Sequence, residues 1–267
     1  TTQGQTTALN QAISMGVDGI ITSADVEPLQ ATLIEAKEAG IPTIGIHGSN
    51  TIGPDEKLNM IYNVATSGTE IGHALADYVI SDSQGKGKVI ILYDAQYAIA
   101  REKAEAMKER IEECESMELL DYVNSPLSEV PNNMPTLASS WVSNHETPFY
   151  IITIADYYYD FVTPTLRSGG INPEDVILLG SDGTSSAYDR IRSGDYQVGT
   201  IPEPATLFGY ISVDEMNRYF NDEELVVYTP GIYIVTKDNI EAEGGDKNIF
   251  VPSNNFADEY AKIWGVE

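Results

Sequence analysis

A doubly wound α/β fold with two parallel-sheet lobes, a hinge and an interlobe cleft is the architecture that this sequence of 267 residues predicts. Over about the first ninety residues, an amphipathic helix, a glycine and a short apolar strand recur in that order. The strands read as continuous apolar runs, which is typical of parallel sheets covered by helices on both faces. Two irregular stretches, residues 61–68 and 202–204, interrupt the alternation and indicate where the chain crosses between lobes.

The first repeat shows the pattern most fully. Leu9 and Ile13 lie near helical spacing, Gly16 suits the left-handed end of a helix, and residues 19–22 read as a buried strand. Two more repeats follow: a helix over 29–36, Gly40 and a strand over 41–46, then a helix over 71–79, Gly85 and a strand over 89–93. Strand and helix alternating in this way build a parallel sheet.

The same alternation continues to the end of the chain. Helices are predicted over 98–114, 136–142, 158–167, 186–191, 205–220 and 256–264, and strands over 119–123, 149–154, 176–179 and 198–201. Residues 241–246 are the one plainly loop-like stretch. We expect residues 1–63 with 204–235 to form an incomplete N-terminal lobe, and residues 64–203 with 236–267 to form a C-terminal lobe.

Composition excludes several classes of function. Asp and Glu total 41 against 15 Lys and Arg, and the resulting net charge of −26 would be repelled by nucleic acid and by anionic bilayers. Apolar residues make up 42% of the chain, which is ample for a core. Cys114 is the single cysteine, so an intrachain disulfide and a cysteine-based zinc site are excluded.

Cofactor, metal and catalytic motifs are also missing from the sequence. Gly85–Lys88 resembles a phosphate loop but precedes its strand, and no Gly-x-Gly-x-x-Gly opens a helix. The three histidines, His47, His73 and His145, have no partner at helical metal-site spacing. No Gly-x-Ser-x-Gly motif presents a nucleophile. We therefore expect no cofactor, no metal and no enzymatic activity.

Polar and aromatic residues instead follow five successive predicted strands. Because the carboxyl ends of parallel strands share one edge, these side chains are predicted to line a polar cage with aromatic walls. Carboxylates and arginine form strong hydrogen bonds to hydroxyl groups, and tyrosine offers flat apolar faces. The pattern favours a polyhydroxylated ligand. The candidate ligand-binding residues are His47, Asp94, Tyr97, Arg101, Asp156, Tyr157, Asp182 and Glu203.

Each candidate also has a structural alternative that the sequence leaves open. Asp182 is as well suited to a turn and helix cap as to ligand contact. Arg101 can pair with Glu105 on its own helix face. In the run 157–159, at most one or two tyrosine rings can face a cleft, and His47 can be an ordinary loop residue.

An ordered set of motifs resembles a known family. Residues 15–21 and 35–42, followed by 100–103, 180–184 and 199–203, are similar in order and spacing to the type I periplasmic sugar-binding proteins, the ribose-binding-like receptors of ABC importers. The resemblance covers about residues 9–235. It implies two lobes that close on a sugar by hinge motion and then dock on a membrane permease. It also implies an extracytoplasmic location, in the periplasm or lipid-anchored at the cell surface.

Within that resemblance, Arg101 and Asp182 match residues that bind sugar hydroxyls, and Glu203 stands where the family often has Gln. Asp156 matches the Asp beside a ligand-binding Asn, for which this chain has Ala155. The Asp-Arg pair of ribose-type members is absent after the strand that ends before His47, which argues against ribose. With three carboxylates nearby, an amine-bearing ligand in cation–π contact with tyrosine is an alternative to a neutral sugar.

The resemblance also predicts a shortened beginning. Family members open with a strand, a helix and a second strand that have no counterpart here, so the first lobe is expected to leave a sheet edge exposed. Exposed edges pair readily with other chains. We therefore expect either a fragment or a homodimer whose interface covers that edge.

The alternative function is the ligand-sensing domain of a LacI-type transcription repressor, which shares the two-lobed architecture. That family carries a helix-turn-helix headpiece and often a second Asp where this chain has Gly183. Neither is present, and the net charge disfavours DNA.

Overall fold

The computed structural model describes residues 1–244 and 247–266. The chain forms two compact units, which share no sheet. Unit 1 comprises the described parts of residues 1–67, 204–231 and 252–267, and unit 2 those of 68–203 and 232–251. Both sheets are mixed and mostly parallel, so the predicted α/β fold is confirmed.

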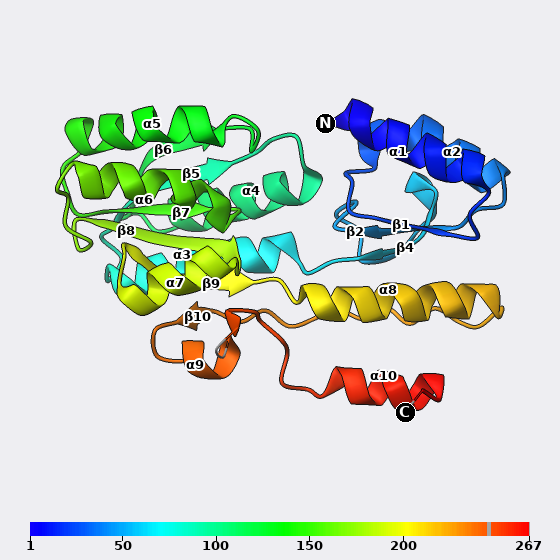
Figure 1. Ribbon diagram of the computed structural model, residues 1–267. Coiled ribbons are helices and arrows are strands. Elements are labelled where there is room, and N and C mark those ends of the chain that lie inside the picture. Colours follow the sequence, from blue (N-terminus) through cyan, green and yellow to red (C-terminus); the bar gives the residue numbers. More distant parts are fainter. Residues whose placement is uncertain (245–246, 267) are drawn as a thin grey trace. The chain divides into compact units, whose positions relative to one another are not determined.

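Unit 1 is a four-stranded sheet between two helical layers (Figure 1). Its strand order is β1-β2-β4-β3, in which β1, β2 and β4 are parallel and β3 is antiparallel to β4. Helices α1 and α2 cover one face, α8 and α10 the other. The bounds are α1 Thr2–Met15, β1 Ile20–Thr22, α2 Gln30–Glu38, β2 Thr43–Ile46, β3 Gly53–Asp55, β4 Met60–Val64, α8 Ala205–Phe220 and α10 Phe256–Trp264.

The caps and cores of unit 1 follow from the sequence pattern. The Thr1 side chain caps α1 by accepting from the backbone N–H of Gly4, and Gly16 ends the helix in the left-handed conformation with φ of 64°. Leu33 and Met60 belong to the core beneath α1 and α2. The core beneath α8 and α10 is made by Ile44, Tyr62, Val64, Leu207, Phe208, Ile211, Met216 and Phe256.

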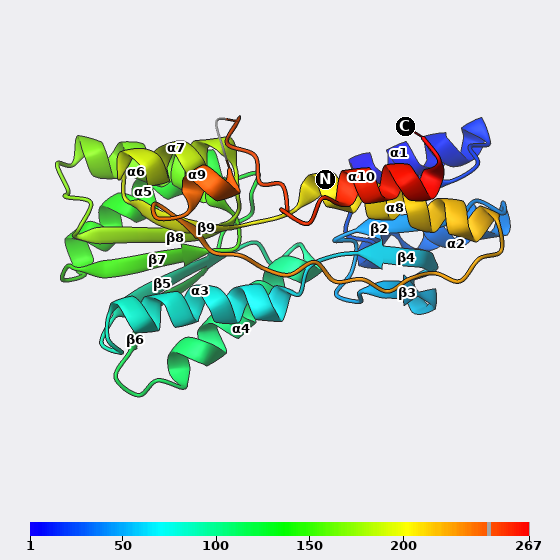
Figure 2. The same ribbon diagram turned by 90° about the horizontal axis from the view of Figure 1, so that it is seen from below.

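Unit 2 is a six-stranded sheet ordered β10-β9-β8-β7-β5-β6, with only β10 antiparallel. Helices α3 and α4 cover one face, and α5, α6 and α7 cover the other (Figure 2). The bounds are α3 Gly68–Asp82, β5 Lys88–Tyr93, α4 Ala98–Glu112, β6 Glu118–Asn124, α5 Val130–Asn144, β7 Phe149–Thr153, α6 Tyr159–Ser168, β8 Val176–Asp182, α7 Ser185–Ser193, β9 Gln197–Pro202, β10 Val235–Thr236 and α9 Ile240–Glu243.

Residues 61–68 are only partly the crossover that the sequence predicts, because β4 occupies the first half of them. Tyr62 and Val64 are buried on one face of this strand. The polar Asn63 is satisfied by the loop after β2, since its Oδ1 accepts from Gly48 N at 2.9 Å and its Nδ2 donates to Ser49 O at 3.0 Å. The passage into unit 2 is therefore confined to residues 65–67.

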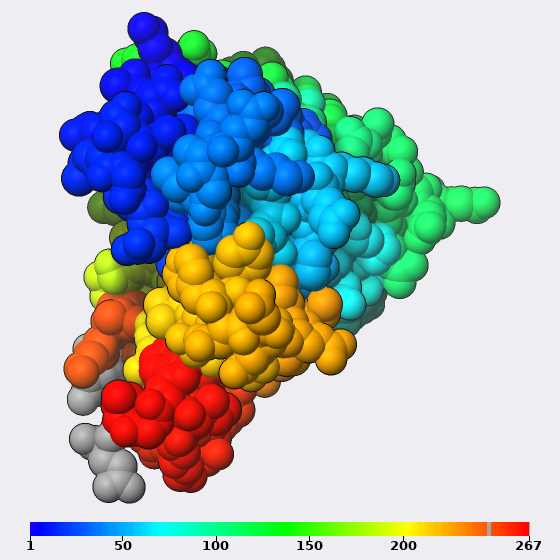
Figure 3. Space-filling view, turned by 90° about the vertical axis from the view of Figure 1, so that its right-hand side faces the viewer, coloured from blue at the N-terminus to red at the C-terminus, as the bar shows by residue number. Residues whose placement is uncertain are grey.

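The C-terminal tail differs from the predicted division, because residues after Val251 pack in unit 1. Helix α10 lies against α8 (Figure 3), where Phe256 enters the core. Trp264 Nε1 also donates to Asp214 Oδ1 at 2.7 Å. Apolar contacts and this hydrogen bond hold the tail in unit 1.

The stretch 241–246 is not simply a loop, because α9 covers its beginning; residues 245 and 246 lie outside the described residues. The two antiparallel edge strands, β3 and β10, were not predicted either. Among the described residues, no helix is long and apolar enough to cross a membrane.

Candidate functional site

The acidic residues that the sequence predicts lie at the carboxyl ends of the parallel strands of unit 2. We call this end of the sheet the carboxyl edge, or acidic edge, of unit 2. Asp94 follows β5, Asp156 follows β7, Asp182 ends β8 and Glu203 follows β9. These strands are parallel neighbours, so their carboxyl ends meet at one edge. Seven of the eight candidates belong to this unit, and His47 belongs to unit 1.

Lys103 is the centre of this edge and was not predicted. Helix α4 places it on the inward face, where only 4% of the residue is exposed. Its Nζ donates to Glu203 Oε1 at 3.0 Å and to Ser181 Oγ at 3.3 Å, and it lies 3.6 Å from Asp182 Oδ1. One lysine thus joins the ends of β8 and β9.

Charge keeps Lys103 protonated in this setting. Burial alone would lower the pKa of its ammonium, but the carboxylates of Glu203 and Asp182 outweigh burial and raise the pKa above the ordinary value. The Lys103 ammonium thus lies within ion-pair distance of both carboxylates. The side chain of Asp182 is still partly open to solvent, so its oxygens can accept hydrogen bonds from a ligand.

Asp156 lies inside unit 2 rather than at the ligand surface where it was predicted. Its Oδ1 accepts from Gln197 Nε2 at 2.7 Å, and its Oδ2 accepts from Thr200 Oγ1 at 2.7 Å and from Gly183 N at 2.9 Å. Burial raises the pKa of this carboxyl to about 7, while the Thr200 hydrogen bond opposes that rise. Asp156 therefore acts as a positioning residue for the turn that follows Asp182.

That turn has a constrained backbone. Asp182 has φ of 95° and Gly183 has φ of 71°, both in the region that favours glycine. A Cβ on Gly183 would come within 2.4 Å of the Pro202 side chain. Thr184 then caps α7 by accepting from Ala187 N. From the sequence, Asp182 could be either a turn residue or a ligand contact. In the structure its backbone forms part of the turn, and its carboxylate lies at the carboxyl edge of the sheet.

Asp94 and Arg101 stabilise the loop after β5 by hydrogen bonds to backbone groups. Asp94 is almost fully buried; its oxygens accept from Gln96 N at 2.9 Å and Leu127 N at 2.8 Å. Arg101 Nη1 donates to Ala95 O at 2.8 Å. Tyr97 is half-buried and immediately precedes α4. These contacts position the loop; the ligand roles of the three residues remain predictions.

Of the three consecutive tyrosines, Tyr157 is the exposed one, at 37%. Tyr158 and Tyr159 are buried, and their hydroxyls donate to Ser125 O and Ile151 O, each at 2.6 Å. The prediction that at most one or two of these rings can face a ligand is consistent with this arrangement. His47, in unit 1, has φ of 53° and packs edge-on against Phe208 at 5.2 Å.

No cofactor or metal chemistry is assigned to these residues. Within residues 1–244 and 247–266, His, Cys, Asp and Glu side chains form no group of three that could hold a metal ion. The carboxylates of Asp182 and Glu203 are hydrogen-bond acceptors held in place by the buried ammonium of Lys103. Such a set can bind hydroxyl or ammonium groups without changing them chemically.

Comparisons with known proteins agree with the α/β fold. A family model described as "Periplasmic binding protein domain" matches residues 1–224. A search of curated protein sequences gave no significant match.

Solved structures of solute-binding proteins are similar in fold. An arabinose-binding component from Shewanella sp. ANA-3 is 16% identical with a TM-score of 0.79, over 97% of this chain and 84% of its own. An Agrobacterium vitis protein bound to tagatopyranose is 16% identical with a TM-score of 0.80, over 92% and 84%. A Bacillus halodurans C-125 protein bound to myo-inositol is 20% identical with a TM-score of 0.76, over 89% and 81%.

Proposed function

We propose that this chain, which belongs to the periplasmic binding protein domain family, is the solute-binding component of an ABC importer for a sugar, polyol or related small polar ligand. The family binds ligands without catalysis and implies an extracytoplasmic protein. The ligand is placed at the carboxyl edge of unit 2. Its capture between two lobes with hinge closure, as the sequence predicts, belongs to the same proposal.

The Lys103 cluster is the observation that supports this placement. A buried ammonium orients Asp182 and Glu203 before any ligand arrives. Carboxylates fixed in this way accept hydrogen bonds from hydroxyl groups at little entropic cost. The arrangement suits a molecule with adjacent hydroxyls.

The carboxylates at this end of the sheet extend the proposal to amine-bearing ligands. The side chain of Asp182 is 40% exposed, so its carboxylate can attract the ammonium group of a ligand. The exposed ring of Tyr157 can add cation–π contact. Amino sugars and small cationic metabolites are therefore part of the proposed class.

A thermal-shift screen against sugars, polyols, amino sugars and small cationic metabolites tests the proposal. A ligand at a hundredfold excess over its Kd should stabilise the folded protein by about 2.7 kcal/mol. Asp182→Asn should lose most of this shift, because an amide is a weaker acceptor for hydroxyl and ammonium groups. Glu174→Gln is the matched control, because Glu174 precedes β8 at the opposite edge of the sheet. A full shift in Asp182→Asn would contradict the placement.

The proposed partner in transport is an ABC permease, and the proposed location is the periplasm or, through a lipid anchor, the cell surface. We further propose a homodimer that covers the edge of the unit 1 sheet. Strand β1 is the terminal strand of that sheet, and 45% of Ile21 is exposed on it. An exposed apolar edge strand is a template for pairing with a second copy.

Light scattering tests the dimer. The wild type should give twice the monomer mass of 29.2 kDa, and Ile21→Lys should give the monomer mass because a charge opposes edge pairing. Ile34→Lys, on α2 with a similar exposure of 44%, should leave the dimer intact. A wild-type monomer at high concentration would count against this part of the proposal.

A further inference from the structure

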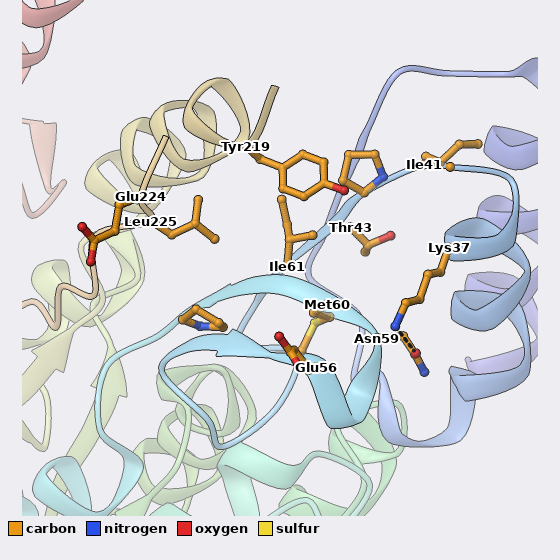
Figure 4. A pocket seen from close by; sticks show the side chains of 13 residues that line it. Lys37, Ile41, Thr43, Glu56, Asn59, Met60, Ile61, Tyr219, Glu224 and Leu225 are labelled. Atoms are coloured by element: carbon orange, nitrogen blue, oxygen red, sulfur yellow. Dashed lines mark hydrogen bonds between the residues drawn. The ribbon is translucent and has the colours of Figure 1, made fainter. Parts of the chain in front are cut away.

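A pocket of about 630 Å³ opens in unit 1 at the amino ends of β2 and β4, the end of the sheet opposite to His47 (Figure 4). Its buried walls are formed by Ile41, Pro42, Thr43 and Met60. The volume lies within the range of small-molecule sites, which are mostly apolar with a few placed polar groups.

The rim of this pocket includes Lys37 of α2, the neighbours of Met60 in the chain, and residues 219–225. Tyr219 near the end of α8 and Leu225 after it add apolar surface, and Ile61 lies beside them (Figure 4). On the opposite side, Lys37 Nζ donates to Asn59 Oδ1 at 3.4 Å. Charged groups are thus confined to the exposed rim, where they remain solvated.

Thr43 places a hydroxyl among these apolar walls. The residue is 2% exposed, and among the described residues its Oγ1 has no hydrogen-bond partner. Figure 4 shows it between Ile61 and Tyr219 on one side and Lys37 on the other. A buried hydroxyl without a partner is unfavourable, so the position is suited to a partner from outside the chain.

We infer that this pocket is a second binding site, for a small, mostly apolar molecule that carries one hydroxyl or carbonyl group. The hydroxyl of Thr43 can donate to either group, and the walls bury the apolar remainder. A sugar does not fit this description, because most of its hydroxyls would face carbon atoms. The inference is independent of the proposed transport function, since the pocket residues belong to unit 1 and the acidic residues of the proposed ligand site belong to unit 2.

Methyl NMR on the full chain, titrated with cyclohexanol and with methylcyclohexane, tests this site. Cyclohexanol should shift the methyl signals of Ile41, Met60 and Ile61 in a saturable way. Thr43→Val, which removes only the hydroxyl, should weaken cyclohexanol binding about fivefold and leave methylcyclohexane binding unchanged or tighter.

Two further variants keep the test decisive. Thr163→Val in unit 2 removes a hydroxyl that donates to Tyr159 O at 2.9 Å, so it should lower the unfolding midpoint and leave cyclohexanol binding unchanged. Thr43→Val should not lower the midpoint. If Thr43→Val fails to fold, Ile61→Trp should fill the pocket and abolish binding of both compounds. Absence of saturable shifts, or equal cyclohexanol affinity in the wild type and Thr43→Val, would overturn the inference.

Discussion

Replacement of Lys103 by Met is expected to lower the free energy of unfolding by about 3 kcal/mol. The ammonium is the buried counterion of Glu203, and its removal abolishes the ion pair between Nζ and Glu203 Oε1 at 3.0 Å. Asp182 contributes less, because 40% of its side chain is exposed and water screens its charge. The volume of the side chain is nearly conserved, so the loss reflects charge and hydrogen bonding rather than a cavity.

Urea unfolding at neutral pH measures this loss, with Lys108→Met as the control. Lys108 lies on the same helix, and its Nζ is 5.3 Å from the centroid of the Tyr122 ring. Its replacement should cost under about 1 kcal/mol. Equal effects of the two substitutions would show that Lys103 does not hold the acidic edge together.

Asp156 is expected to make the protein less stable as the pH rises from about 4 to about 7. Burial raises the pKa of its carboxyl from 3.8 to about 7 in the folded state. The folded protein therefore holds this proton where the unfolded chain has released it. The stabilising contribution is complete below the unfolded pKa and is lost as the pH passes the folded pKa. Since one pKa unit corresponds to about 1.36 kcal/mol, the whole effect amounts to roughly 4 kcal/mol.

The difference in unfolding free energy between the wild type and Asp156→Asn isolates this titration from the other carboxylates. That difference should decline between about pH 4 and 7 and level off above. Asp189→Asn, which removes an exposed carboxylate of α7, is measured in parallel as the surface-charge control. A constant difference for Asp156→Asn would show that its carboxyl titrates normally in the folded protein.

Periodic apolar positions made much of the fold predictable. Helices α8 and α10 have the predicted bounds, and Gly16 ends α1 as expected, because helical spacing and glycine stops are local signals. Helix α5 begins at Val130, earlier than predicted. One proline lies in its first turn and Pro135 lies inside it, and prolines in a sequence usually indicate that a helix has not begun or has ended. The placement of α10 could not be predicted, because it depends on contacts with residues far away in the sequence.

The candidate site was predictable in position but not in role. Strand ends identify Asp156 and Asp182, yet only the fold shows that Thr200 and Gln197 enclose the first while the second stays at the edge. Lys103 did leave a signal, because it shares the inward helical face with Ala100, Ala104 and Met107. A lysine on an apolar face requires buried partners, and the nearest acids in space are distant in sequence.

Isothermal titration with the ligand that the screen identifies is the most direct test of the central claim, that the acidic edge of unit 2 binds the solute. Wild type, Asp182→Asn and Glu174→Gln are compared under identical conditions. We expect Asp182→Asn to weaken binding at least tenfold, corresponding to about 1.4 kcal/mol, and Glu174→Gln to bind as the wild type does. Equal affinity in all three proteins would contradict it.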